Sequence, residues 1–289
     1  MKSRRFDKLC NYFNVITVDI EEWFHGLEPD PSQWSGLTRR LHTSTEKLLE
    51  LFQELDIKAT FFVLGDVAKH TPSLVEQINS EGHEIGSHGM YHRFIYNQTP
   101  AEFREDLKQS IDILVSIINK PVKLYRAPYF SITKNSLWAL EILREEGIVY
   151  DSSIFPIYNH RYGIKNSPRI PYKILSGLWE WPISTLPFWG SNIPFAGGFY
   201  FRFWPHICIE YALSILEKRK EPVLFYFHPW EFDPDQPRLN SNSWFNSYRH
   251  YYKLSKNFRR FKQLLYSRKF TSLSSGIQNY RQLNSKKKE

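Results

Sequence analysis

Cysteines and long apolar runs are scarce in this chain of 289 residues, and each scarcity excludes a class of protein. The two cysteines, Cys10 and Cys208, lack the spacing of metal-binding motifs, so we expect free thiols in a reducing compartment rather than a disulfide framework. No run of about 18 apolar residues occurs, which argues against a transmembrane helix. The basic first residues lack the apolar core of a secretory signal, so we expect a cytoplasmic protein.

Acidic residues are almost missing from the last part of the chain. Residues 236–289 hold 13 of the 38 Lys and Arg residues but only one of the 30 acids, Glu289. The net charge of +8 therefore belongs to this segment, and nucleic-acid binding by the mildly acidic body is disfavoured. The segment fits a solvated helix face with a frayed tail. It also fits contact with an acidic glycan or with the anionic inner face of a membrane.

Buried apolar runs alternate with helical patterns along most of the chain. Capping boxes of Thr43 with Glu46 and of Thr99 with Glu102 open two of the expected helices. The alternation predicts an α/β fold, a distorted (β/α) barrel of mainly parallel strands with about seven strand–helix units and a basic C-terminal helical extension. The expected strands are 12–20, 59–65, 84–88, 123–129, 148–153 and 222–228, and the expected helices are 43–55, 72–80, 99–118, 134–146, 205–219 and 248–270.

Reactive side chains stand where these buried strands end. In a β/α barrel the carboxyl ends of the strands converge on one face, which is the face that carries active sites. We therefore expect these side chains to lie close together. They are Asp19, His88, Arg126, Asp151 and His228.

His88 and His92 stand four residues apart, a spacing that lets two imidazoles share a cation. Such a pair alone more often reflects packing. Asp19 and Glu21 lie on one side of an extended segment, so one carboxylate can complete a zinc-type site and the other can act as the general base. Two histidines and a carboxylate suit Zn²⁺ and also accept other divalent ions. Glu21 and Glu22 also fit solvated loop charges, Glu22 more so than Glu21.

Arg126 and His228 have similar pairs of interpretations. A guanidinium can hold a catalytic carboxylate in place, or it can form an ordinary structural ion pair. An imidazole at the end of an apolar strand can protonate a leaving amine, or it can be a hydrogen-bonded core histidine.

Six motifs in order resemble the polysaccharide deacetylase family, that is, the chitooligosaccharide deacetylase homology domain or carbohydrate esterase family 4. The resemblance spans residues 15–235, and its variants look like the branch associated with bacterial exopolysaccharide gene clusters, which often has a C-terminal extension. It implies a catalytic domain over 1–235 and a basic extension over 236–289, packed on the barrel or trailing from it. The motifs are TVDIEEW, ATFFVLG, HEIGSHGMYH, YRAPY, YDSSIFP and FYFHPWE.

The resemblance also implies roles for individual residues. The first motif departs from the family's two adjacent aspartates, because Ile20 stands where the second one binds metal. Some members have Asp-x-Asp, so Glu21 is the natural replacement ligand. Asp151 matches the fourth motif loosely and would orient His228. The remaining roles are Asp19 as general base, His88 and His92 as metal ligands, Arg126 as tether of the base, Tyr129 as backbone donor to the oxyanion, and His228 as general acid.

These roles predict a metal-dependent hydrolase, with Zn²⁺ favoured, that removes acetyl groups from an N-acetylated glycan or a lipid-linked sugar. A catalytically silent glycan-binding module and an amidohydrolase of another small amide are the alternatives. Aromatic side chains in the later part of the chain suit the faces of sugars, and they also suit loop packing. The candidates for sugar stacking are Trp181, Trp189, Tyr200 and Trp230.

Overall fold

The computed structural model describes residues 14–28, 30–239 and 244–285. Cys10, the basic first residues and the end of the C-terminal tail lie outside these ranges, whereas Cys208 is an exposed free thiol. Within the described ranges, no helix is both long and apolar enough to cross a membrane.

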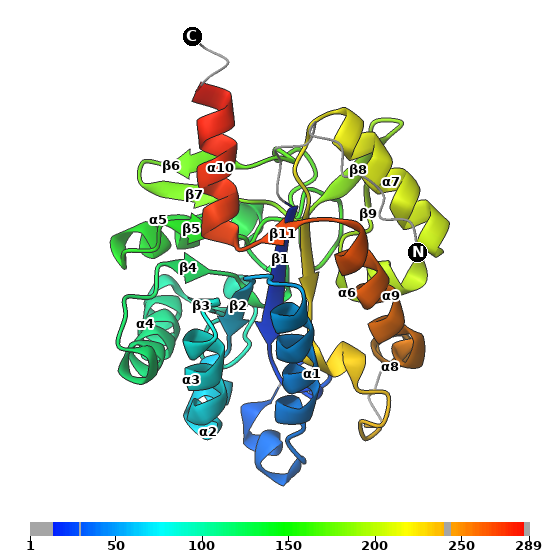
Figure 1. The fold of residues 1–289 in the computed structure, drawn as a ribbon. Coiled ribbons are helices and arrows are strands. Elements are labelled where there is room, and N and C mark those ends of the chain that lie inside the picture. The colour runs from blue at the N-terminus through cyan, green and yellow to red at the C-terminus, as the bar shows by residue number, and fades with distance from the viewer. Residues whose placement is uncertain (1–13, 29, 240–243, 286–289) are drawn as a thin grey trace.

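A curled sheet of nine strands forms the centre of the molecule (Figure 1). Its order is β10-β1-β2-β3-β4-β5-β7-β6, and β11 also pairs with β1. Every pairing is parallel except that of β6 with β7, so the α/β fold with mainly parallel strands is confirmed. The strands are β1 (Asn14–Ile20), β2 (Thr60–Val63), β3 (Glu84–Ser87), β4 (Leu124–Tyr125), β5 (Tyr150–Asp151), β6 (Tyr172–Leu175), β7 (Leu178–Glu180), β10 (Leu224–Phe227) and β11 (Phe270–Thr271), with β8 (Thr185–Phe188) and β9 (Ser191–Pro194) in a separate hairpin.

Helices surround the sheet, with α1 to α4 beside the early strands and α6 to α9 gathered near β10 (Figure 1). Short 3₁₀ turns follow several strand ends, among them η3 (Pro128–Phe130) after β4 and η5 (Pro229–Phe232) after β10. The α-helices are α1 (Leu41–Glu54), α2 (Gly65–His70), α3 (Pro72–Ser80), α4 (Pro100–Ile118), α5 (Trp138–Glu145), α6 (Gly198–Phe203), α7 (His206–Lys218), α8 (Trp244–Tyr251), α9 (Leu254–Ser267) and α10 (Leu273–Ser285).

The two predicted capping boxes have different outcomes. The Thr99 side chain accepts a hydrogen bond from the Glu102 amide and Glu102 binds back, so the start of α4 is confirmed. The box at Thr43 is wrong, because α1 begins at Leu41. A carboxylate distant in sequence caps this helix instead: Glu22 accepts hydrogen bonds from the Arg40 amide at 3.0 and 3.1 Å. Tertiary contacts thus override the local cap signal.

The predicted helix over 248–270 is also wrong in its extent. It is two helices, α8 and α9, separated by Lys253 in the left-handed conformation at φ 53°, and the segment then forms β11. The chain continues into α10, which the sequence pattern did not predict. The strand β11 joins the central sheet through Asn14 and Val15, so these later residues pack on the first strand.

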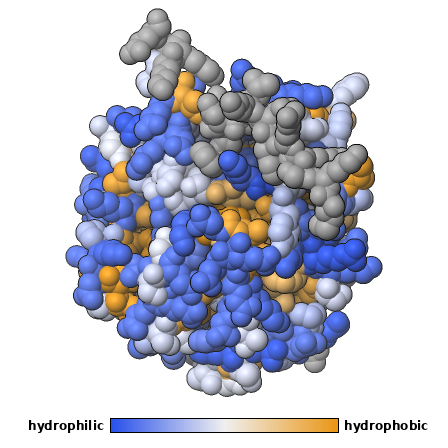
Figure 2. Space-filling model, in the orientation of Figure 1, coloured by the Kyte–Doolittle hydropathy of each residue, from blue (hydrophilic) through white to orange (hydrophobic). Residues whose placement is uncertain are grey.

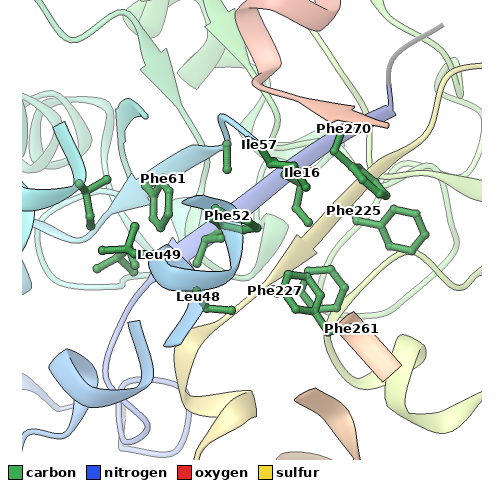
Figure 3. Packing of buried hydrophobic residues seen from close by; sticks show 14 of the residues in the cluster. Ile16, Leu48, Leu49, Phe52, Ile57, Phe61, Phe225, Phe227, Phe261 and Phe270 are labelled. Atoms are coloured by element: carbon green, nitrogen blue, oxygen red, sulfur yellow. The ribbon is translucent and has the colours of Figure 1, made fainter. Parts of the chain in front are cut away.

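Apolar side chains from distant segments form the largest core cluster (Figure 3). Ile16 on β1 lies among Phe52 of α1, Phe225 of β10 and Phe261 of α9, and all four are fully buried. At about 25 cal/mol per Å² of buried apolar surface, such residues dominate the stability of the fold. The face of the molecule seen in Figure 2 is mainly hydrophilic, with apolar side chains in small groups.

Candidate active site

The carboxyl edge of the sheet carries the predicted reactive residues. Asp19 lies near the end of β1, and His88, Arg126 and His228 directly follow β3, β4 and β10. Because these strands are parallel and adjacent, their ends meet at one edge, where a cavity of about 180 Å³ opens. Seven of the residues singled out in the sequence line this cavity: Asp19, Glu21, His88, His92, Tyr129, His228 and Trp230.

Glu21, His88 and His92 form a buried cluster of potential metal ligands. Their ligand atoms all lie within 4.8 Å of one another. His88 Nδ1 lies 2.8 Å from the Arg126 carbonyl oxygen, a contact that assigns the proton to Nδ1 and leaves the lone pair of Nε2 facing Glu21. His88 Nε2 lies 3.9 Å from Glu21 Oε2, and His92 Nε2 contacts the same oxygen, which is buried and accepts no hydrogen bond from the described residues.

The protonation states of this cluster also suit a cation. Burial lowers the pKa of His88 to about 4, so its imidazole is neutral at pH 7, as a ligand must be. Burial of Glu21 opposes its ionisation, but the interactions with His92 and His228 prevail and bring the pKa of Glu21 well below the ordinary value. An ionised, buried carboxylate between two imidazoles is the donor set of a divalent metal site, and it fits Zn²⁺.

The turn that carries the two histidines is strained and supported from α4. His92 has φ 53°, which is costly for a residue with a side chain, and Gly89 has φ 75°. Asp106 stabilises the turn by accepting a hydrogen bond from the Met90 amide at 2.7 Å. The two histidine side chains therefore point toward the same place only because the turn between them is held in this conformation.

Arg126 holds the carboxylate of Asp19. Its guanidinium is fully buried and donates to Asp19 Oδ1 at 2.7 Å, to Thr17 Oγ1 at 2.7 Å, and to both oxygens of Ser152 at 2.8 and 3.0 Å. It also stacks on the Phe62 ring at 4.4 Å. With its donors occupied, Arg126 fixes one oxygen of Asp19. The other oxygen, Oδ2, lies 3.9 Å from His228 Nε2.

His228 faces the carboxylates through Nε2 and is held from behind through Nδ1. Nε2 lies 3.5 Å from Glu21 Oε1, and Nδ1 lies 2.5 Å from Glu231 Oε1. Burial alone lowers the pKa of His228, but the charges of Glu21, Glu231 and Asp19 raise it to about 9. The imidazole is therefore protonated at neutral pH, the state that a general acid requires.

Glu231 is itself tied to the C-terminal helices through Arg202 of α6. Both side chains are buried, and Arg202 Nε donates to Glu231 at 3.1 Å. The other nitrogens of Arg202 donate to the carbonyls of Arg249 at 3.1 Å, His250 at 2.8 Å and Tyr252 at 2.6 Å. The sequence interpretation missed Glu231 and Arg202. The three-residue spacing in HPWE was a usable signal for Glu231, but no local pattern identifies Arg202.

Asp151 has a different partner from the one expected. It is fully buried at the end of β5 beside Glu180 of β7, and burial raises the pKa of Asp151 to about 6 and that of Glu180 well above its ordinary value. Asp151 accepts from Ser153 Oγ at 2.5 Å, and Ser153 Oγ accepts from the Ala127 amide at 2.8 Å. Asp151 thus supports the strand end that carries Arg126, while Glu231 orients His228.

Comparisons with known proteins divide the chain into two parts. Residues 34–148 match the polysaccharide deacetylase family, and residues 152–278 match a domain of unknown function, DUF3473. Residues 34–148 are thus a polysaccharide deacetylase family region. The deacetylase part contains His88, His92, Arg126 and Tyr129, and the second part contains His228. Asp19, Glu21 and Asp151 lie outside both matched ranges. The site therefore spans both parts.

Relatives with assigned names match only part of this chain. A peptidoglycan-N-acetylglucosamine deacetylase of Bacillus cereus is 39% identical over 111 residues, which are 35% of this chain and 41% of the relative. A chitin deacetylase of Pestalotiopsis sp. is 34% identical over 100 residues, 33% of each chain. The chain thus spans less than half the length of these relatives.

Solved structures resemble the fold over nearly the whole chain. A Mycobacterium smegmatis protein whose name assigns it to the polysaccharide deacetylases has a TM-score of 0.63 at 17% identity and covers 94% of this chain and 92% of its own. A Bacillus subtilis peptidoglycan deacetylase has a TM-score of 0.50 at 14% identity, with 96% of each chain covered. At these identities the likeness shows the fold alone, and it agrees with the curled, mainly parallel sheet.

Of the remaining residues considered in the sequence, Glu22 lies away from the cavity, whereas Tyr129 and Trp230 line it. Glu22, interpreted as a solvated loop charge, is 2% exposed and caps α1, so that interpretation is wrong. Tyr129 has φ 56°, and its ring centroid lies 4.3 Å from that of His92. Trp230 stacks on His228 at 5.0 Å and donates to Glu21 at 3.1 Å.

The other three aromatic candidates do not line the cavity over the described residues. Tyr200 bonds the Tyr162 hydroxyl at 2.8 Å, next to the cavity wall. Trp181 is fully buried, whereas Trp189 is 93% exposed near the turn between β8 and β9.

Proposed function

We propose that this protein hydrolyses the acetamide of an N-acetylated sugar in a glycan, releasing acetate and a free amino group. One observation carries the proposal: an Arg-held carboxylate and a Glu-held imidazolium face each other beside a ligand cluster of one Glu and two His. The deacetylases that share part of this sequence act on peptidoglycan and chitin, which supports an N-acetylhexosamine as the substrate.

Each group of the site has a place in this reaction. Glu21, His88 and His92 would hold a divalent cation, Zn²⁺ by the donor set, which supplies Lewis-acid polarisation of the acetyl carbonyl when bound. Asp19 accepts a proton from the attacking water through Oδ2, since Arg126 holds Oδ1. The backbone N–H of Tyr129 stabilises the oxyanion.

His228 completes the reaction at the other side of the amide. Its Nε2 proton is donated to the departing nitrogen as the C–N bond breaks, and the new C–O bond leaves acetate as the second product. Glu231 holds Nδ1 and so directs Nε2 into the cavity. The neutral imidazole then recovers a proton from solvent, and Asp19 releases the one it accepted.

Acetate release from N-acetylglucosamine oligomers, measured with and without a chelator, tests the proposal. We expect release that stops on chelation and returns with Zn²⁺. Binding of the oligomers without any release would favour the glycan-binding module. Release from small acetamides but from no sugar would favour the general amidohydrolase.

Four features expected from the sequence stay predictions. These are the boundary at residue 235, the cytoplasmic location, contact of the basic segment with a membrane surface, and a lipid-linked acceptor. Contacts support a structural role for the basic segment, because carbonyls of residues 249–252 bind Arg202.

A further inference from the structure

A second cavity adjoins the first at Arg161 and Tyr162, which line both. Its volume is about 670 Å³, within the usual range of about 300–1,000 Å³ for ligand sites. It lies between the loop at residues 157–166 and the segment at residues 133–135, with Tyr96 beside them. Because two residues are shared, a polymer whose acetylated unit occupies the first cavity can continue into the second.

The lining of this second cavity is basic. It contains Lys134, His160, Arg161 and Lys165, and no Asp or Glu is among its described lining residues. No carboxylate in the described part of the chain lies within ion-pair distance of these four. Tyr158 adds an aromatic ring that is 83% exposed. Unpaired positive charge next to an exposed ring suits an anionic sugar, which offers both a charge and an apolar face.

Arg161 is held at the border of the two cavities by aromatic rings. Its guanidinium carbon lies 5.2 Å from the centroid of Phe94 and 5.9 Å from that of Tyr129. Tyr129 in turn lies against His92. Stacking fixes the plane of a guanidinium but leaves its N–H donors available for a carboxylate. Arg161 thus stands one ring away from the candidate metal ligands.

Arg249 of α8 adds a second guanidinium in the first cavity. It interacts with the Tyr162 hydroxyl and stacks on Phe199 at 5.3 Å, and among the described residues it has no ion-pair partner. The other charges at this cavity are balanced. Asp19 pairs with Arg126, Glu21 lies 3.5 Å from the protonated His228, and Arg202 pairs with Glu231. Arg161 and Arg249 therefore leave an excess of positive charge on both sides of Tyr162.

We infer that the second cavity binds an acidic sugar residue, one carrying a carboxylate, next to the N-acetylated residue in the first cavity. The glycan substrate is then one in which acetamido sugars have uronic-acid-type neighbours. Arg161 forms the bidentate contact to the carboxylate, and Lys134 and Lys165 add long-range attraction. This assignment rests on the proposed function for the choice of the sugar in the first cavity.

Binding of paired glycans tests the inference. The probes are hyaluronan and heparosan hexasaccharides, in which N-acetylglucosamine alternates with glucuronate, and the same oligosaccharides with their carboxyl groups reduced to alcohols. Calorimetry is done on full-length Asp19→Asn protein, so that acetyl groups are retained. We expect at least one native hexasaccharide to bind about tenfold more tightly than its reduced form, with the difference lost at high salt. Equal binding of both native and reduced pairs would overturn the inference.

Variants locate the effect. Arg161→Gln is expected to remove the tenfold preference for carboxylate, measured as the ratio of the affinities for the native and the carboxyl-reduced hexasaccharide, while Lys134→Gln with Lys165→Gln removes part of it. Lys47→Gln, an exposed lysine on α1 that lines neither cavity, is the matched control and should change nothing. A loss of affinity for neutral and acidic glycans alike in Arg161→Gln would contradict an anion site.

Turnover by the unmodified enzyme separates the two proposals. Acetate release from native and carboxyl-reduced oligosaccharides at equal rates would refute the acidic subsite and leave the deacetylase intact. Carboxylate-dependent binding without acetate release from any acetylated glycan would refute the deacetylase and keep the anion site.

Discussion

The two halves of the site are built in different ways. The base and the metal ligands come from neighbouring strands early in the chain, and Arg126 reaches Asp19 directly across the sheet edge. The acid, His228, also ends a strand, but its support comes from Glu231, Arg202 and the carbonyls between α8 and α9. Sheet geometry fixes the first half, whereas the second half depends on how irregular segments pack.

The family matches follow this division only in part, because Asp19 and Glu21 precede both matched ranges. The part that matches polysaccharide deacetylases contributes strand ends and the histidine turn, and the part of unknown function contributes the acid and its support. The reactive groups lie at strand ends in both parts of the chain. Glu231 and Arg202, the side chains that hold the acid His228, come from the part of unknown function. Variants in each half therefore have distinct expected effects.

Replacing Asp19 should have the largest effect. Asp19→Asn keeps the shape of the side chain but removes the base, so we expect kcat for acetate release to fall by about 10²–10⁴. Folding, followed by circular dichroism, should persist. The matched control is Asp112→Asn on the exposed face of α4. Unchanged acetate release by the Asp19 variant would contradict the role of this half.

Cutting the link to the C-terminal helices should mainly affect stability. Arg202→Met removes one of the two cationic partners of the buried Glu231 and leaves three carbonyls without their Arg202 donors, so we expect the free energy of unfolding to fall by about 3–5 kcal/mol. Urea denaturation measures it, with Arg219→Met, an exposed arginine after α7, as control. A loss under about 1 kcal/mol would show that the C-terminal segment packs independently of the acid.

Glu231→Gln should show whether Glu231 acts on the protonation and orientation of His228 rather than on substrate binding. The amide still accepts from Nδ1, but the negative charge that raises the pKa of His228 is gone. We expect kcat to fall by about 10–100-fold with KM nearly unchanged. Because the acid must be protonated, the alkaline limb of the rate profile should move to lower pH. Glu76→Gln on α3 serves as the control. If the alkaline limb of the rate profile did not move in Glu231→Gln, Glu231 would not be the residue that keeps His228 protonated.

The buried pair of Asp151 and Glu180 should have the smallest effect. Burial raises the pKa of Asp151 to about 6, so the folded protein retains a proton that the unfolded chain releases near pH 4. This carboxyl therefore lowers stability as pH rises between these values. Asp151→Asn should gain about 2 kcal/mol relative to the parent between pH 4 and pH 7, measured by denaturation at both. Contributions from buried histidines are the same in both proteins and cancel when the variant is compared with the parent. If the free energies of unfolding of the two proteins changed in parallel with pH, Asp151 would not titrate in this range.

Sequence alone determined β1 to β5 and β10 and the reactive residues at the ends of five of them, because an apolar run and the residue that ends it are local properties. It did not define β6 to β9 or β11. With parallel strands, Asp19, His88, Arg126 and His228 had to meet at one edge. The replacement ligand Glu21 could be named for the same reason, since side chains alternate along an extended segment.

Tertiary structure alone decided what stands behind and beside those residues. The pairing of Glu231 with Arg202, the cap that Glu22 forms on α1, and the cavity lined by both Lys134 and Lys165 all join residues that are not neighbours in the sequence. No period in the sequence encodes such pairs, because loop packing and burial bring them together. The reactive residues could thus be predicted from the strand pattern. The side chains that support His228 and the residues that line the basic cavity are brought together only by the tertiary structure.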